Sequence, residues 1–134
     1  MLKYIDMNFC EILLPNEAKQ LNPLALAFVG DAVHSLFVRE ILVHKQDSKA
    51  GVLHTLTSSE VKCTHQCLML DKIIDSFTEE EIDIYKRARN CHNNNVAKNA
   101  TLVEYKKATG FEAVIGYLYL TGQRERLTVF LGVK

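Results

Sequence analysis

Residues 24–42, LALAFVGDAVHSLFVREIL, decide the fold, because they have the pattern of a long apolar helix. Asn22 and Pro23 come directly before this stretch. Together they favour a helix start, since Asn caps free N–H groups and Pro suits the first helical position. Apolar residues recur at helical spacing as far as Leu42, and a polar segment follows at 44–49. The stretch therefore predicts a helix from Pro23 to about residue 44.

Helical patterns also account for the middle of the chain. One runs over residues 49–74, and we expect a break in it near Ser58 and Ser59. The segment TEEE at 78–81 is a capping box, in which a Thr caps the helix and a Glu three residues later reaches back. It predicts a helix that begins after residue 78 and ends near Asn90.

The C-terminal third continues in the same way. Residues 91–99 are polar, rich in Asn and without a period, so they predict a loop. The helical period resumes at Thr101, with Gly110 as an expected junction, Gly122 as a stop and a last short helix over 123–132. Because no strand pattern competes with these helices, the sequence predicts an all-α fold.

The composition fits one helical domain over residues 1–134. Hydrophobic residues make up 48% and charged residues 24%, with six Gly and two Pro, which disfavours a disordered chain or a turn-rich all-β fold. Four cysteines are too few for a disulfide scaffold, and the N-terminus lacks the apolar centre of a signal peptide. No apolar run approaches the ~20 residues that span a bilayer. We expect a cytoplasmic protein outside the membrane, with reduced thiols and no second domain.

Charge is polarised along the chain, although its 16 basic and 16 acidic residues balance. Residues 71–84 carry six acids and one Lys, whereas residues 86–107 carry six basic residues and one Glu. The balanced total therefore does not exclude a nucleic-acid partner, because the basic segment can bind phosphates. The competing interpretation of the basic segment is a solvated surface helix.

Two acidic residues interrupt apolar helical stripes. At about 100° per residue, Asp31 shares a face with five apolar residues, Leu24, Ala27, Phe28, Val38 and Leu42. Glu112 likewise shares a stripe with Ala108, Ile115, Gly116 and Tyr119. A buried carboxylate without a partner is costly, so each of these acids needs a donor, a cation, a metal or a proton.

Two explanations remain open for these acids. An Arg or backbone partner in the core would make each acid structural. If the helices instead pack so that both acids meet in one cleft, two carboxylates and water would form a site suited to Mg²⁺. Gly30, Gly110 and Gly116 lie beside the acids and indicate a close approach, although Gly disfavours helix interiors. The glycines either let two helices come into contact, which is the preferred explanation at Gly116, or leave room for a ligand.

Other polar residues give weaker signals. Cys63, His65 and Cys67 suggest zinc, but on a helix the His points nearly opposite to the two Cys, so ordinary thiols are favoured. His34 and His92 could approach a site or RNA, yet a partly exposed histidine is the simpler expectation for each.

Two segments carry a resemblance to a known family. LAFVGDAV at 26–33 and GFEAVIGYLYL at 110–120 resemble the signature helix and the later acidic helix of the ribonuclease III catalytic domain. Residues 85–113 are similar to the corresponding part of the Mini-ribonuclease III group, the short bacterial form without a double-stranded-RNA-binding domain. The resemblance covers about residues 20–130 and implies an all-α, ribonuclease III-like domain.

The resemblance carries over only Asp31 and Glu112, as both metal-binding and catalytic residues. The broader family has further acids seven and four residues before the Asp and three residues before the Glu. Those positions are Leu24, Ala27 and Thr109 in this chain. The differences look like the pattern of the Mini form.

The resemblance also implies a function. It implies a homodimer that holds double-stranded RNA across two active sites, with Mg²⁺-dependent phosphodiester hydrolysis in maturation of the large-subunit (23S) ribosomal RNA precursor. Duplex RNA is recognised through phosphates and 2′-hydroxyls. The expected RNA-binding residues are Lys86, Arg87, Arg89, Asn90 and Lys98. A non-catalytic helical RNA-binding or ribosome-assembly factor is the alternative, and a purely structural helical dimer is a third option.

Overall fold

The described part of the chain is built from helices. The computed structural model describes residues 8–45, 49–91 and 101–132. Its elements are α1 (Pro15–Lys19), α2 (Pro23–Lys45), α3 (Ala50–Val61), α4 (Cys63–Ile73), the 3₁₀ turn η1 (Ile74–Ser76), α5 (Glu79–Arg89), α6 (Leu102–Leu120) and α7 (Arg124–Phe130). No strand occurs within these ranges, and the predicted all-α fold is confirmed.

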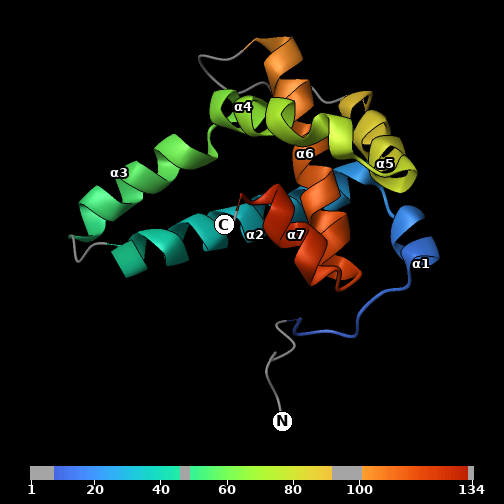
Figure 1. Cartoon of the computed structure of the whole chain (residues 1–134), viewed down its shortest axis with the longest axis horizontal. Coiled ribbons are helices and arrows are strands. Elements are labelled where there is room, and N and C mark those ends of the chain that lie inside the picture. The colour runs from blue at the N-terminus through green and yellow to red at the C-terminus, as the bar shows by residue number, and fades with distance from the viewer. Residues whose placement is uncertain (1–7, 46–48, 92–100, 133–134) are drawn as a thin grey trace.

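Helix α6 runs through the centre of the molecule, and α2, α4, α5 and α7 pack around it (Figure 1). A helix with apolar residues on every side is expected to be buried all round. From Ala108 to Leu118, every residue of α6 except Glu112 is buried. This central segment of α6 therefore carries one acid, Glu112, at the edge of the core.

Helices α2 and α6 cross at a pair of glycines. A Cβ atom at Gly30 would collide with the backbone carbonyl oxygen of Glu112, and one at Gly116 would collide with that of Leu26. Gly inside a helix costs about 1 kcal/mol relative to Ala, so a close contact is needed to explain it. Here the contact is between the two backbones. The expectation of helix contact at Gly116 is confirmed.

The helices start where the sequence predicts. Asn22 Oδ1 accepts a hydrogen bond from the Leu24 backbone N–H at 2.9 Å, and α2 begins at Pro23. At α5, the backbone N–H of Thr78 donates to Glu81 Oε1 at 2.9 Å, and the Glu81 N–H donates to Thr78 Oγ1 at 3.2 Å. These two reciprocal bonds are the predicted capping box.

Two expected breaks fall elsewhere. The break in the second helical region occurs at Lys62, whose backbone is extended, while Ser58 and Ser59 stay within α3. Gly110 is not a junction, because α6 continues through it. A Cβ atom at Gly110 would press against the ring of Tyr85 in α5, so this glycine is required by helix packing.

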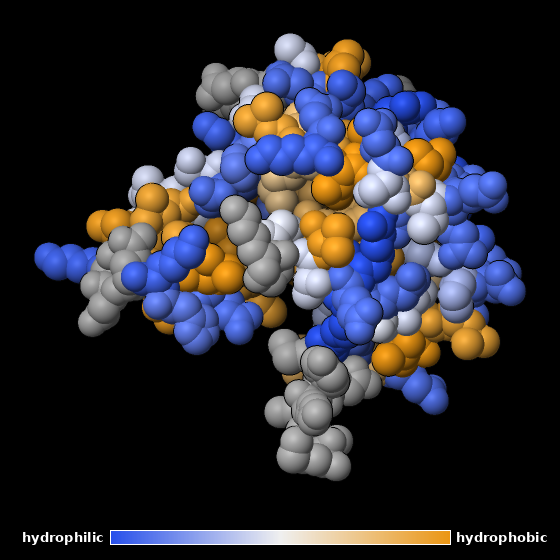
Figure 2. All heavy atoms as spheres, viewed as in Figure 1, coloured by the Kyte–Doolittle hydropathy of each residue, from blue (hydrophilic) through white to orange (hydrophobic). Residues whose placement is uncertain are grey.

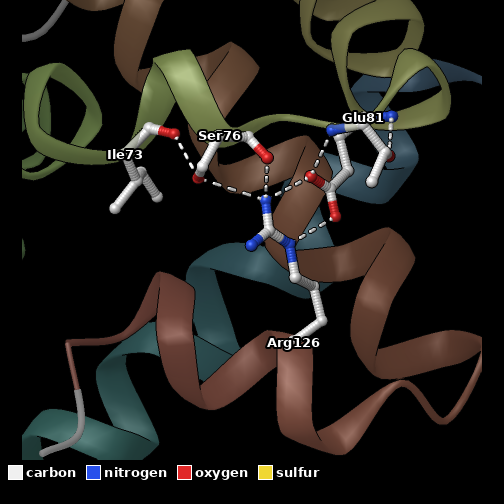
Figure 3. A network of polar contacts seen from close by, with 5 residues as sticks. Ile73, Ser76, Glu81 and Arg126 are labelled. Atoms are coloured by element: carbon white, nitrogen blue, oxygen red, sulfur yellow. Dashed lines mark hydrogen bonds and ion pairs between the residues drawn. The ribbon is translucent and has the colours of Figure 1, made fainter.

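A buried ion pair connects α7 to α5 (Figure 3). Arg126 Nε donates to Glu81 Oε2 at 2.9 Å, and Nη2 donates to Glu81 Oε1 at 2.8 Å. Nη2 also donates to the backbone carbonyl of Ser76 at 2.7 Å, at the end of η1. Glu81 is only 2% exposed, and this bidentate pair, the Arg126 clamp, satisfies its carboxylate.

The C-terminal half of α2 and helix α3 extend from the body as a two-helix arm (Figure 1). Figure 2 shows that hydrophobic residues reach the surface along this arm. Val43 and Val52 are two exposed apolar residues of these helices. Within the described ranges, none of the helices has the length and apolar content needed to cross a bilayer.

Candidate active site

The crossing of α2 and α6 brings the two predicted acids together. Asp31 follows Gly30 on α2, and Gly30 packs against the backbone of Glu112 on α6. The carboxyl groups of Asp31 and Glu112 share a hydrogen bond. The two acids, 81 positions apart in the sequence, therefore form one site.

Asp31 is exposed, which corrects the expectation that it lies inside an apolar stripe. The buried residues of α2 are Leu26, Ala27, Gly30, His34 and Val38. Phe28, which was expected on the inward face with Asp31, is 81% exposed. The glycine crossing decides which face of α2 turns inward. Asp31 follows Gly30 directly, and neighbouring residues lie about 100° apart around a helix, so its side chain falls at the edge of that face.

Glu112 is the more deeply placed member of the pair, half-buried where Asp31 is exposed. Burial, the charge of Asp31 and the hydrogen bond with Asp31 together raise the pKa of Glu112 to about 8, while a hydrogen bond from Gln66 opposes them. Among the described groups that act on Glu112, none is a cation. An added cation would offset both the burial and the repulsion, because it favours the ionised carboxylate.

Gln66, which sequence reasoning missed, and His34, which it left as a possible neighbour of a site, complete the arrangement. Gln66, from α4, donates from Nε2 to Glu112 Oε2 at 3.2 Å, and the same nitrogen lies 3.0 Å from Nδ1 of His34 in α2. Both side chains are buried, so the expectation of a partly exposed His34 was wrong. No spacing rule links residues from three helices. The signal that the sequence did offer was a polar residue at an inward-facing position of a helix, His34 in α2 and Gln66 in α4.

The ionisation of His34 reflects this setting. Burial and, to a smaller extent, the charge of His65 lower its pKa to about 4, while the charge of Asp31 acts in the opposite direction. The ring is therefore neutral at pH 7. Its neutrality matters for the contact with Gln66, because only an unprotonated Nδ1 can accept a hydrogen bond.

The broader family has additional acids at three positions near the site. In this chain those positions hold uncharged residues. Thr109 lies one turn before Glu112 and is buried, with its Oγ1 donating to the Tyr105 carbonyl at 3.0 Å. Ala27 is buried one turn before Asp31, and Leu24 is half-buried two turns before it. In the described ranges, no group of three or more His, Cys, Asp or Glu side chains is arranged to hold a metal ion.

Three of the predicted RNA-binding residues lie at the exposed end of α5. Lys86 and Asn90 are exposed. The guanidinium of Arg89 lies 5.5 Å from the centroid of the Tyr85 ring, and its Nε donates to Asn90 Oδ1 at 3.2 Å. These polar groups face solvent beside one another.

The other two differ from them. Arg87 points toward the body, where its Nη1 donates to the backbone carbonyl of Lys19 at 2.9 Å and lies 3.8 Å from Asp83 Oδ2. It ties α5 to α1. Lys98 lies outside the described residues.

Side chains of the CTHQC segment, residues 63–67, contact other residues of the protein. Cys67 Sγ donates to the backbone carbonyl of Glu104 at 3.3 Å, and His65 Nε2 lies 3.0 Å from Glu60 Oε2. Burial raises the pKa of the thiols of Cys63 and Cys67, which keeps both of them protonated. These contacts agree with ordinary thiols.

Comparison with known proteins identifies the family. Residues 24–123 match the Ribonuclease III domain family, a range that includes both Asp31 and Glu112. The chain belongs to the ribonuclease III family. It is therefore an endoribonuclease, a hydrolase of RNA processing, and the non-catalytic alternatives are set aside.

Similar proteins agree with this assignment. The chain is 46% identical over 112 residues to Mini-ribonuclease 3 of Clostridium tetani, covering 83% of this chain and 74% of the relative. It is 42% identical over 118 residues to Mini-ribonuclease 3 of Staphylococcus aureus, covering 87% and 88%. A crystal structure of a protein from Fusobacterium nucleatum matches with a TM-score of 0.78 at 31% identity, over 87% of this chain and 93% of that one. The predicted resemblance to the Mini form of ribonuclease III is confirmed.

Proposed function

We propose that this ribonuclease III domain hydrolyses phosphodiester bonds of double-stranded RNA, with Mg²⁺ held by Asp31 and Glu112. One observation carries the proposal: carboxylates from α2 and α6 meet, and the described groups acting on Glu112 include no cation. Two like charges side by side in a partly buried site are unfavourable. An RNA phosphate would add more negative charge, so the site needs a cation to bind its substrate.

The residues present fit Mg²⁺. Two carboxylates supply oxygen ligands, and Gln66 turns its nitrogen, which is no ligand for a hard cation, toward Glu112. Mg²⁺ usually keeps several waters and binds through one or two carboxylates, so a site with few protein ligands suits it. Zinc is disfavoured, because it usually takes several Cys or His ligands, whereas His34 turns its Nδ1 to Gln66 and no group of three or more His, Cys, Asp or Glu is arranged to hold a metal among the described residues. When bound, Mg²⁺ would polarise the scissile phosphate, activate an attacking water and neutralise the leaving oxygen.

Asp31 and Glu112 have different tasks in this mechanism. Asp31 is exposed, so its carboxylate can be reached from solvent and by a phosphate of the RNA. Glu112 lies deeper, and its carboxylate is held by the hydrogen bond from Gln66. Because its pKa is about 8 without a cation, the Glu112 carboxyl carries a proton at neutral pH. It releases that proton to water when a cation binds.

The exposed end of α5 would contact the RNA. Lys86, Arg89 and Asn90 present charged and polar groups at the surface, which suits the phosphates and 2′-hydroxyls of a duplex. Arg87 is included in this proposal only for its charge, because its Nη1 is engaged by Lys19. Lys98 is included from the sequence alone. Neutralising phosphates releases counterions, so binding should weaken as salt is raised.

We also propose a homodimer through the outer face of α2. Phe28 and Leu36 are 81% and 59% exposed there, and both help to line a hollow of about 490 Å³ that Val33 and Leu127 also line. Contiguous exposed apolar surface marks interaction sites. A two-fold interface presents the same patch on both copies, so a protruding ring next to a hollow lets each copy fill the other.

The dimer is tested by Phe28→Asp. This variant should sediment as a monomer at a concentration where the parent is a dimer, because two carboxylates would be buried at the interface. Val103→Asp, at a residue of similar exposure on the first turn of α6, should stay dimeric. A parent chain that is a monomer in the ultracentrifuge would refute the dimer.

The biological setting extends the proposal by resemblance to the Mini form. The substrate would be the precursor of the 23S ribosomal RNA, processed in the cytoplasm by residues 1–134 acting as a single domain. Incubation with a precursor transcript should give a product with defined new ends. Uniform degradation of the transcript would contradict this substrate.

The central experiment is cleavage of a long RNA duplex with Mg²⁺ or with EDTA. EDTA should abolish cleavage. Asp31→Asn and Glu112→Gln should each lower the rate by more than about 100-fold, since even outer-shell changes at metal sites cost roughly 10- to 100-fold. Circular dichroism should show that both variants keep their helices.

The matched control is Asp75→Asn, an exposed acid of η1 away from the crossing. It should cut like the parent. If Asp31→Asn and Glu112→Gln also cut like the parent, the site is wrong. If the parent cuts no duplex under any condition with Mg²⁺, double-stranded RNA is the wrong substrate.

A further inference from the structure

Gln66 links the two-carboxylate site to a third helix, α4, through a side chain that is 2% exposed. Its Nε2 donates to Glu112 Oε2 at 3.2 Å and lies 3.0 Å from His34 Nδ1. An amide nitrogen carries two hydrogens, so these two contacts use both. The amide therefore has one favourable orientation, with its nitrogen toward Oε2 of the Glu112 carboxyl group.

His34 maintains that orientation. Because an amide nitrogen only donates, His34 Nδ1 must accept, and the ring proton is on Nε2. The ring packs edge-on against Phe111, with centroids 6.3 Å apart and an interplanar angle of 88°. Burial lowers the pKa of His34 to about 4, so its Nδ1 stays an acceptor at neutral pH. A half-turn of the Gln66 amide would place its oxygen against both acceptors.

We propose that Gln66 is a positioning residue for Glu112 and that His34 holds the Gln66 amide in its donating orientation. The proposal rests on the proposed function, because it takes Glu112 as a carboxylate that binds the cation. With Oε2 engaged by Gln66, the Glu112 carboxylate is fixed in one rotation. A ligand fixed in advance binds its ion more tightly, because less freedom is lost on binding.

A purely structural role for Gln66 predicts something different. Buried amides need hydrogen-bond partners wherever they occur, so removing one costs stability in any part of a core. That cost does not depend on a cation. Affinity for a metal ion in the absence of RNA therefore separates a positioning role from a structural one.

The test is Mn²⁺ binding to the full chain, measured by calorimetry without RNA, with Mn²⁺ as the probe for the Mg²⁺ site. Gln66→Met removes the donor and keeps a side chain of similar length. It should raise the Kd for Mn²⁺ by roughly 10- to 100-fold. Tyr117→Phe is the matched control, because Tyr117 is equally buried on α6 and loses its 2.7 Å hydrogen bond to Glu80. The control should bind Mn²⁺ like the parent.

A pair of His34 variants tests the second half of the proposal and replaces Gln66→Met if that variant does not fold. His34→Asn can keep an oxygen acceptor near the position of Nδ1, whereas His34→Leu cannot. His34→Leu should raise the Kd for Mn²⁺ about as much as Gln66→Met, and His34→Asn should restore most of the affinity. Equal Kd values for the two His34 variants would overturn the role of His34.

Two results would refute the role of Gln66. One is a Kd for Gln66→Met equal to that of the parent, and the other is an equally raised Kd for Tyr117→Phe. The failure of the proposed function looks different, because Asp31→Asn and Glu112→Gln would then bind Mn²⁺ as well as the parent does. In that case both proposals fall. If only the Gln66 and His34 variants match the parent, the site stands and the positioning role is wrong.

Discussion

Glu81 and Glu112 are glutamates set into helices of the same core, and their surroundings are opposite. Glu81, on α5, accepts two hydrogen bonds from Arg126 and a third from the backbone of Thr78. Glu112, on α6, faces the carboxyl of Asp31 and receives one neutral donor, Gln66. Glu81 is thus paired with a cation that the protein supplies, Arg126. Glu112 is paired with a second acid, Asp31.

The difference shows that burial alone does not identify a functional carboxylate. Removal from water makes any acid costly, and the protein can offset that cost with an internal cation. Where it supplies a second acid, one carboxyl group holds a proton, and both can ionise only when a cation comes from outside. The Arg126 clamp is thus a structural solution, and the Asp31–Glu112 pair is the candidate functional site that we propose.

Breaking the clamp should have the largest effect. Arg126→Met leaves Glu81 buried without a cation, with only the Thr78 backbone N–H as a donor, so the free energy of unfolding should fall by about 3–5 kcal/mol. Urea unfolding of the parent and the variant at pH 7 measures this loss. The double variant with Glu81→Gln should recover part of the loss, because the stranded charge is removed. A loss below about 1 kcal/mol would mean that the clamp behaves like a surface pair.

Acid should weaken the site region through His34. The pKa of His34 is about 4 in the folded chain and ordinarily 6.5, so the unfolded chain binds more protons between these values. Stability is therefore lost as the pH falls from 6.5 toward 4, by up to about 3 kcal/mol. Between pH 4 and 6.5, the free energy of unfolding of His34→Asn, measured with urea, should change less with pH than that of the parent. Parallel curves for the two proteins would contradict the prediction.

Alkali should weaken the same region through Glu112, with the opposite sign. Its pKa of about 8 lies above the ordinary value of 4.5, so the folded chain binds more protons between these values and stability falls as the pH rises through 8. At pH 9 in EDTA, Glu112→Gln should be more stable than the parent by about 2 kcal/mol, since solution ions screen part of the charge. Near pH 5 the difference should be small. Greater stability of the parent at pH 9 would show that Glu112 is already neutralised internally.

Mg²⁺ should give the smallest of these effects. A cation at ten times its Kd stabilises the folded chain by about 1.4 kcal/mol through mass action. Thermal or urea unfolding of the parent should show this gain over EDTA at matched ionic strength. Glu112→Gln should show little of it, and the Arg126 clamp variants should keep it. An equal gain in all variants would indicate non-specific binding of the cation.

Local signals predicted the helices well. Asn22 before Pro23 and the capping box at Thr78 fixed the starts of α2 and α5, because capping depends on a few neighbouring residues. Gly110 misled, because its cause is a ring of another helix. The break at Lys62 has no strong local signal, and the serines expected to break the helix are tolerated within α3.

The candidate site was predictable only in part. Periodicity selected Asp31 and Glu112 as unusual acids, but it placed Asp31 on the inward face of α2, where the structure has His34. Gln66 was missed, because its role depends on where α4 lies relative to α6. The clamp was missed for the same reason. The sequence identified Glu81 only as a capping residue, and its second partner comes from α7.

The glycine crossing has one more consequence, for how the enzyme can change over time. The separation of the two helix backbones that carry these carboxylates is set by main chain resting on main chain at Gly30 and Gly116. Substitutions among the aliphatic residues of the core can therefore alter stability while leaving the separation of α2 and α6 at the site unchanged. The spacing of the helices that carry the candidate site is thus insulated from most of the sequence, and that tolerance depends on keeping Gly30 and Gly116 without a side chain.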